Sequence, residues 1–398
     1  MKAWFRPLLI AGLGSLALAG CSLFEDDDEE QIIVAELVEF EKQFEAKELW
    51  STSVGSGVGD HASRLRPAVA YDKVFAASRD GVVKALKKDN GKAVWETHLG
   101  EPDDERWFGG RHSAMVSGAI TVAYQQLFIG TERGFVYSLN ADTGEQRWKA
   151  VVGGEVLAPP AVSDGMVVVN TLSGKVYGLD AETGEEKWVF ENAVQPLTLR
   201  GSGTPAISQG GVFMGTPDGK LNALFLDRGF QIWEEQVTQP SGTNDLERMV
   251  DVDADVIISG DAAYAVAYNG DLVSVELRTG REKWKRPYSS YQGMAIDGFD
   301  IYLSNSSSYV YSINRNDGSE SWVNLNLENR QITTPSVVKG YVVVGDMEGY
   351  LHWLDDSTGE FVSRMEVDSD GLYSEAVVDE GVIYVQSRDG DVYAIETP

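Results

Sequence analysis

The chain has 398 residues, of which 43% are hydrophobic and 10% aromatic, enough apolar material for a large packed core. Its 62 Asp and Glu outnumber its 33 Lys and Arg, and so acidic a surface argues against nucleic acid or anionic lipid headgroups as direct partners. With a single cysteine, the chain can form neither an intrachain disulfide nor a cysteine-based zinc site.

Residues 1–20 have the layout of a lipoprotein signal peptide. After a basic start, the apolar run from Leu8 to Leu18 is too short to span a bilayer as a stable helix. The only cysteine follows in Leu18-Ala19-Gly20-Cys21, which resembles a lipobox, where the thiol receives a diacylglycerol and the preceding peptide bond is cut. In lipoproteins of this type an aspartate directly after the cysteine favours retention in the inner membrane. Here that residue is Ser22, which favours the outer membrane. We therefore expect Cys21 to be the lipidated mature N-terminus; an ordinary signal peptide with a chance cysteine is the alternative.

Residues 21–48 are expected to form a lipidated acidic tether. Six consecutive carboxylates at residues 25–30 repel one another, so this run should stay solvated and extended. Farther on, apolar positions could mark a short helix, but we assign no structure to residues 31–47. The apolar positions are Ile32, Ile33, Leu37, Phe40 and Phe44.

Residues 49–398 are built from a repeat whose clearest copy runs from Pro160 to Trp188 and ends in Asp-x-x-Thr-Gly-Glu-x-x-Trp. Each copy holds three alternating apolar and polar runs bounded by Gly and Asp turns, followed by a shorter run that carries the Trp. This pattern predicts four antiparallel strands, the blade of a β-propeller, because no helical period of comparable strength occurs. The Trp is placed to pack against the neighbouring blade. The copies close with Trp95, Trp148, Trp188, Trp233, Trp284 and Trp322, and Ser363 stands where the seventh Trp belongs.

The number of copies predicts an all-β, eight-bladed propeller of four-stranded antiparallel blades. Seven units are complete, and residues 375–395 supply three strands of an eighth blade without a Trp strand. The missing strand lies at the other end of the repeat, in residues 48–53 around Trp50. Pairing the two ends would close the ring and protect the last sheet edge. Seven blades are the alternative.

No arrangement of residues typical of catalysis, metal binding or cofactor binding is found, so we expect neither an enzyme nor a cofactor. The segment 251–255 begins like a calcium loop but lacks its sixth-position Gly and twelfth-position Glu. The Trp repeat also resembles that of pyrroloquinoline quinone dehydrogenases, but those enzymes stack the quinone on a disulfide of adjacent cysteines, and this chain has one cysteine. The four histidines, His61, His98, His112 and His352, lie far apart in sequence.

Several stretches go beyond the generic blade pattern, namely residues 50–57, 199–201, 267–270 and 344–353. On these the chain resembles the BamB family, the propeller lipoproteins of the outer-membrane β-barrel assembly machinery. The resemblance implies a non-enzymatic scaffold, lipid-anchored at the periplasmic face of the outer membrane of a Gram-negative bacterium. It would bind the periplasmic POTRA domains of BamA and assist folding and insertion of β-barrel proteins; unfolded outer-membrane proteins are a further partner that the resemblance allows. A lipoprotein propeller that binds a peptide, a sugar or a cell-wall fragment is the alternative.

Two links between blades are unusual and should lie side by side on one rim. One carries Leu197 and Leu199, and the other makes the interval from Trp233 to Trp284 51 residues long, against 40 in the plainest unit. An exposed apolar pair bordered by charges suits a contact patch, although the leucines could instead plug the channel mouth while the aspartates cap turns. The resemblance also implies a role for residues of both links, and the following Ala254-Asp255 departs from the family pattern. The residues implied in BamA binding are Leu197, Leu199, Arg200, Asp251 and Asp253.

Overall fold

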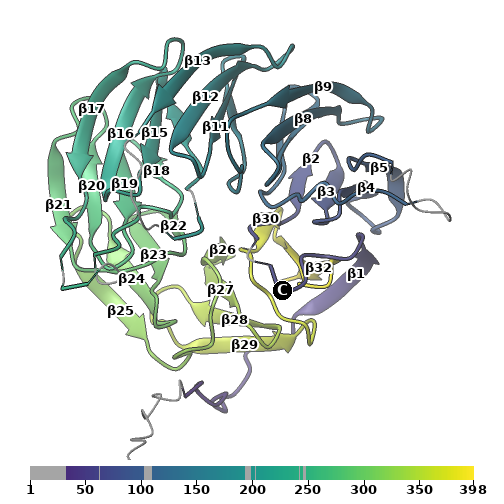
Figure 1. Ribbon diagram of the computed structural model, residues 1–398. Helices are drawn as coiled ribbons and strands as arrows, with labels where there is room; N and C mark the ends of the chain where they lie inside the picture. Colours follow the sequence, from purple (N-terminus) through teal and green to yellow (C-terminus); the bar gives the residue numbers. More distant parts are fainter. Residues whose placement is uncertain are drawn as a thin grey trace, which may run out of the picture. The chain divides into compact units, whose positions relative to one another are not determined.

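The strands expected from the repeat form eight four-stranded antiparallel sheets arranged around a ring (Figure 1). The computed structural model describes residues 33–398, except 62, 103–109, 193–198, 202, 242 and 245–247. No helix occurs in this described part of the chain, and so none there could cross a membrane. The prediction of an eight-bladed propeller is confirmed.

The strands follow one another blade by blade. Blade one comprises β2 (Ala68–Ala70), β3 (Lys73–Ala77), β4 (Val82–Lys87) and β5 (Ala93–His98); blade two β6 (Thr121–Ala123), β7 (Gln126–Gly130), β8 (Phe135–Asn140) and β9 (Gln146–Val151); blade three β10 (Ala161–Ser163), β11 (Met166–Asn170), β12 (Lys175–Asp180) and β13 (Glu186–Glu191); blade four β14 (Ala206–Ser208), β15 (Gly211–Gly215), β16 (Lys220–Phe225) and β17 (Gln231–Gln236). Blade five comprises β18 (Ile257–Ser259), β19 (Ala262–Val266), β20 (Leu272–Glu276) and β21 (Glu282–Arg286); blade six β22 (Met294–Asp297), β23 (Asp300–Ser304), β24 (Val310–Asn314) and β25 (Glu320–Asn324); blade seven β26 (Ser336–Val338), β27 (Tyr341–Gly345), β28 (Tyr350–Asp355) and β29 (Phe361–Glu366); blade eight β30 (Val377–Asp379), β31 (Val382–Gln386), β32 (Asp391–Glu396) and β1 (Lys47–Ser53).

The shortest strand of a blade is the first one, which corrects the expectation that the Trp strand is shortest. First strands have three residues, or four in β22, whereas the Trp strands have five to seven. The first strands contact one another around the centre of the ring, as β2 does with β6 and β30. The blades converge there and leave little room, while the Trp strands lie at the circumference.

Each Trp locks its blade to the next one, in a contact that we call a seam. The indole N–H of Trp148 donates to the carbonyl of Ala181 in the next blade at 3.1 Å. The ring covers Gly184, whose φ is +73° and where a Cβ would lie 2.6 Å from the indole. The Thr-Gly turn therefore needs glycine both for its backbone and for the neighbouring indole. The same arrangement recurs for Trp50 on Gly91, Trp95 on Gly144, Trp188 on Gly229, Trp233 on Gly280, Trp284 on Gly318 and Trp322 on Gly359.

The remaining seam, between blades seven and eight, is filled by the N-terminal segment 34–46, which we call the strap. Ser363 replaces the Trp, and its hydroxyl donates to the carbonyl of Phe44 at 2.8 Å. The Phe44 ring packs edge-on against Trp353 of β28, with ring centroids 6.1 Å apart. Because β1 and β32 come from opposite ends of the chain, no Thr-Gly turn joins them, and an indole at position 363 would have no glycine to cover.

The strap changes the expected boundary between tether and propeller. It is extended rather than helical, and its backbone bonds to blade seven, for example from the Gln43 N–H to the carbonyl of Val362 at 2.8 Å. Residues 47–48 already belong to β1. The tether predicted for residues 21–48 therefore does not extend through residues 34–48.

Strand β1 closes the ring by pairing with β32, as predicted. Trp50 lies opposite Ala394 and Thr52 opposite Val392 in an antiparallel register. Figure 1 shows these first and last strands side by side. The closure satisfies the edge of the last sheet with the chain's own backbone.

Candidate functional site

The two unusual links lie side by side, as their positions in the repeat predict. The backbone N–H of Leu199, in the link from blade three to blade four, donates to Asp251 Oδ2 at 3.0 Å. Asp251 belongs to the link from blade four to blade five. Leu197 lies outside the described residues.

In the link from blade four to blade five, residues 251–256 alternate between the core and the side that faces the Leu199 link. Val252, Ala254 and Val256 are buried in the core, while the aspartates between them face the Leu199 link. Asp251 accepts the Leu199 N–H, and Asp255 Oδ1 accepts the N–H of Thr204 at 2.8 Å. The path after Asp253, where the sequence departs from the family pattern, is therefore fixed by Asp255.

Asp253 lies between these two contacts, against Gly201. A Cβ at Gly201 would lie 2.6 Å from Asp253 Oδ2, so any larger residue there would displace the Asp253 carboxyl. Asp251 and Asp253 are 1% and 5% exposed, which corrects the expectation that they form an exposed charged border. They hold the Leu199 link from beneath. One oxygen of each, Asp251 Oδ1 and Asp253 Oδ2, accepts no hydrogen bond from the part of the chain that the structure describes.

Burial changes the ionisation of both aspartates. Loss of hydration raises the pKa of Asp251 to about 6 although the Leu199 N–H favours the ionised form. Loss of hydration and the neighbouring Asp251 raise the pKa of Asp253 to about 7 despite the opposing charge of Arg64. Around neutral pH the site therefore contains a carboxyl that is partly protonated.

Among the predicted site residues that the structure describes, Arg200 and Leu199 reach the surface. The Arg200 side chain is 44% exposed and donates to Glu132 and Glu155 at 2.9 and 3.0 Å. Glu132 is itself buried and also pairs with Arg79 at 2.9 Å. Burial opposes the ionisation of Glu132, but the two guanidinium groups lower its pKa below the usual value. Leu199 is half-buried and lines the mouth of the central channel.

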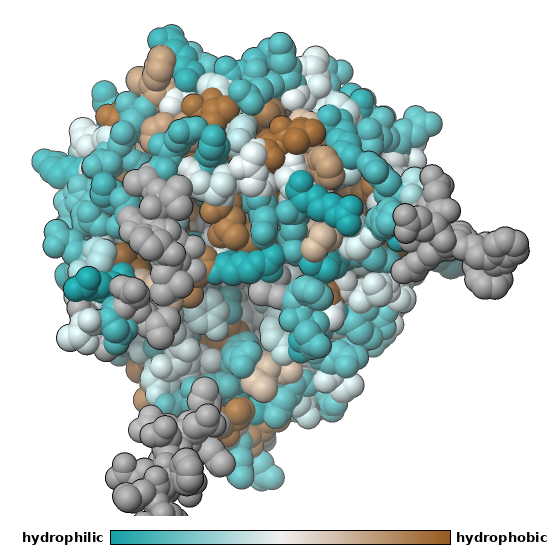
Figure 2. All heavy atoms as spheres, in the orientation of Figure 1, coloured by the Kyte–Doolittle hydropathy of each residue, from teal (hydrophilic) through white to brown (hydrophobic). Residues whose placement is uncertain are grey.

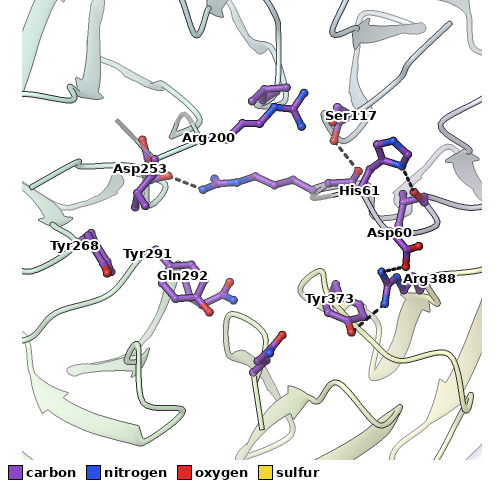
Figure 3. A pocket seen from close by; sticks show the side chains of 17 residues that line it. Asp60, His61, Ser117, Arg200, Asp253, Tyr268, Tyr291, Gln292, Tyr373 and Arg388 are labelled. Carbon is purple, nitrogen blue, oxygen red and sulfur yellow. Dashed lines mark hydrogen bonds and ion pairs between the residues drawn. The ribbon is translucent and has the colours of Figure 1, made fainter. Parts of the chain in front are cut away.

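The channel mouth is a cavity of about 550 Å³ that opens beside these links (Figure 3). Tyr268, Tyr291 and Tyr373 line it together with Leu199 and Arg200. Figure 2 shows a predominantly hydrophilic face with small hydrophobic patches between the polar residues. The mouth thus offers aromatic and aliphatic surface within a polar border, an arrangement typical of protein-contact patches.

Among the described residues, one cluster of three aspartates has the spacing to bind a cation. Oxygens of Asp368, Asp389 and Asp391 lie within 4.8 Å of one another. Asp368 accepts the Tyr393 hydroxyl at 2.8 Å, and Asp389 accepts that of Ser387 at 2.5 Å. These carboxylates lie apart from the links, and their hydrogen bonds to neighbouring hydroxyls account for part of their acceptor capacity.

Sequence reasoning missed Arg64 and the role of Asp255. Arg64 Nη1 donates to Asp255 Oδ1 at 3.0 Å, and Nη2 donates to the carbonyl of Asp253 at 2.7 Å. The alternation of Asp with small apolar residues over 251–256 could have indicated that the three aspartates share one side of an extended run. Nothing in the sequence around Arg64 indicated its partner, which lies about half the chain away.

Comparisons of sequence and of structure with known proteins point to the same family. A family model described as "Outer membrane protein assembly factor BamB" matches residues 28–125 and 79–324. The protein of that name from Shewanella oneidensis is 43% identical over 398 residues, covering all of both chains. The crystal structure of BamB from Moraxella catarrhalis superposes with a TM-score of 0.78 at 26% identity, covering 88% of this chain and 100% of that one.

The propeller is also shared with enzymes. A quinohemoprotein alcohol dehydrogenase from Comamonas testosteroni superposes with a TM-score of 0.68 at 13% identity, covering 88% of this chain and 76% of that one. At this identity the likeness concerns the fold alone.

Proposed function

This chain belongs to the BamB family, and from that membership we propose that it is a non-enzymatic scaffold lipoprotein of the outer-membrane protein assembly machinery. It binds the POTRA domains of BamA and assists the folding and insertion of β-barrel proteins. The observation that carries the proposal is the full-length identity of 43% to an outer membrane protein assembly factor.

The partner-binding surface that we propose is the rim formed by the two links. Leu197, Leu199 and Arg200 provide the contacts, while Asp251 and Asp253 hold the Leu199 link in place. The hydrogen bond from Leu199 to Asp251 and the fit of Gly201 against Asp253 support this division, because both aspartates are buried. A half-buried leucine beside an exposed arginine suits the centre and border of a protein interface.

We further propose that Cys21 carries the lipid and holds the propeller at the periplasmic face of the outer membrane. The sequence from Leu18 to Cys21 and the serine that follows it support this assignment. With a formal net charge of −29, the protein gains little attraction to anionic headgroups, so the acyl chains supply the membrane affinity.

The rim is tested by two double variants of the full-length protein, Leu199→Ala with Arg200→Ala and Asp251→Ala with Asp253→Ala. The first removes contacting side chains and the second releases the Leu199 link. Each should weaken binding to BamA by about 2 kcal/mol or more, roughly 30-fold, measured as co-purification and as Kd. Both variants should still fold into the propeller, as shown by cooperative thermal unfolding.

A matched control is Arg228→Ala with Phe230→Ala, an exposed arginine and an exposed aromatic residue on the outer hairpin of blade four. This pair should leave BamA binding unchanged. Retained binding in both rim variants, or loss that accompanies unfolding, would show that the rim is not the interface.

A further inference from the structure

Arg64 spans the central channel. It precedes β2 of blade one, and its guanidinium reaches Asp253 and Asp255, which precede β18 of blade five. In a ring of eight, blades one and five are opposite. Asp253 and the residues beside Arg64, such as His61, lie on opposite sides of the mouth in Figure 3.

The base of the Arg64 side chain is held firmly. Its backbone N–H donates to the carbonyl of Ser117 at 3.0 Å, and the Ser63 hydroxyl donates to the same carbonyl at 3.0 Å. The next residue, Leu65, is buried in the core shared by blades one and two. The Arg64 backbone is therefore anchored on one side of the ring, and its side chain reaches the segment 251–255 on the other side. We call this segment, which carries Asp251, Asp253 and Asp255, the aspartate run.

The guanidinium contacts the residues that hold the Leu199 link. Asp255 accepts from Arg64 and from the N–H of Thr204 through the same oxygen, Oδ1. The contact to the Asp253 carbonyl fixes the backbone on which the Asp253 carboxyl lies against Gly201. Each end of the Leu199–Thr204 segment is thus bonded to a carboxylate of a run that Arg64 holds in place.

The aspartate run also needs this positive charge. Asp251, Asp253 and Asp255 place three carboxyl groups within five residues, two of them buried. Among the described residues, the cations that pair with this run are Arg64 and Arg66, and Arg66 lies 4.0 Å from Asp255 while pairing with Glu375 at 3.0 Å. Without Arg64 the aspartate run would keep only Arg66, which is distant and shared with Glu375, among the described cations. Repulsion between the carboxylates would then favour displacement of the run.

We infer that Arg64 is a positioning residue for the partner-binding rim, which it holds in shape from the opposite side of the ring. The inference rests on the proposed function for its biological meaning, since the segment held in place is the rim assigned to BamA. The rim is then a property of the closed propeller rather than of blades three to five alone.

The first test is hydrogen exchange in the full-length protein without any partner. In Arg64→Ala, amides of residues 199–204 should exchange about tenfold faster, the effect expected when a charge-assisted hydrogen bond is lost. The control is Arg388→Ala at the same mouth, which removes a guanidinium paired with Asp60 rather than with the aspartate run. It should leave exchange at 199–204 unchanged, and the strands of both variants should exchange as in the parent. Unchanged exchange of residues 199–204 in Arg64→Ala would overturn the inference.

The second test is the Kd for the periplasmic region of BamA. Arg64→Ala should weaken binding about tenfold, and adding Asp255→Asn to it should cause little further loss because both changes release the same segment. A Kd within twofold of the parent value, or two losses that add fully, would contradict the inference. If the parent protein itself fails to bind BamA, the proposed function is wrong, whereas the exchange result still decides whether Arg64 positions the link.

Discussion

Asp253 is a carboxyl group that the fold places almost entirely out of water. Its Oδ2 accepts no hydrogen bond from the described residues, and its pKa rises to about 7 through burial and the nearby Asp251. A carboxylic acid in the unfolded chain ionises near pH 4. Between about pH 4 and pH 7 the folded protein therefore holds a proton that the unfolded chain releases.

This difference fixes the sign of a pH dependence. The stability that the protonated Asp253 contributes is fully present below about pH 4 and is lost as the pH rises from there to about 7. Asp253→Asn cannot ionise, so its free energy of unfolding relative to the parent should increase by about 2 kcal/mol between pH 5 and pH 8. Denaturant unfolding of both proteins at the two pH values measures this change. Asp261→Asn, at an exposed aspartate paired with Lys283, serves as the control and should show little of it.

Leu199 and Arg200 show how two adjacent residues acquire different roles. Leu199 turns toward the channel mouth, while Arg200 is held by the buried Glu132 and the half-exposed Glu155. The contrast arises from neighbours contributed by blades two and three, far from this link in sequence. Two residues that look equally exposed in the sequence therefore differ in role because their neighbours in space differ.

At the scale of elements, the seams between blades combine a conformational requirement with a packing requirement. Gly165 and Gly184 separate these two requirements within blade three. Both have positive φ, +76° and +73°, but a Cβ at Gly165 would meet nothing within 4 Å, whereas one at Gly184 would press on the Trp148 ring.

Alanine at each glycine therefore has a different expected cost. Gly165→Ala should lower the free energy of unfolding by about 1 kcal/mol, the cost of a left-handed backbone alone. Gly184→Ala should cost an additional 1–3 kcal/mol, roughly, because the Trp148 indole must move. Chemical denaturation of the two variants measures the difference. Equal losses would mean that the indole contact contributes nothing to the glycine requirement.

The strap is the element that compensates for the break in the repeat. Phe40 stacks on Phe361 of β29 with ring centroids 5.5 Å apart, and Phe44 packs against Tyr341 and Trp353. Backbone carbonyls of the strap also accept hydrogen bonds from Arg330, in the link from blade six to blade seven, and from Arg364 of β29. Apolar rings and arginine contacts thus replace the indole and glycine of the other seams.

At the scale of the whole molecule, the described unit begins with the strap on blade seven, and the proposed anchor precedes it. Several acyl chains on Cys21 would bind the bilayer firmly, since each buried methylene contributes about 0.8 kcal/mol. Cys21→Ser should therefore shift nearly all of the protein out of the outer-membrane fraction or leave it unprocessed, as measured by fractionation and intact mass. The thermal stability of the propeller should not change, because its strands and strap begin at Val34.

The neighbouring substitution Ser22→Ala keeps the thiol and should leave processing intact. Normal membrane partitioning of Cys21→Ser would contradict the lipid-anchor proposal. The result is independent of the rim variants, since it concerns the anchor and not the partner surface.

The sequence by itself determined the blade architecture, because the blade is a local unit. Its strands, turns and Trp recur about every 40 residues, so turn chemistry and alternation indicate it without knowledge of distant contacts. The count of Trp residues also predicted that the strand around Trp50 pairs with residues 392–395 and closes the ring. The adjacency of the two links followed in the same way, because equivalent positions of successive blades must be neighbours.

Only the tertiary structure decided what long-range contacts impose on individual residues. Burial of Asp251 and Asp253, the reach of Arg64 across the channel and the strap beside Ser363 each join segments far apart in the chain. Local pattern carries no information on such pairs, since the same Asp alternation suits an exposed border or a buried support. The closed ring brings these segments together, and burial in it, rather than residue type, determines which charges face water and which hold the rim in place.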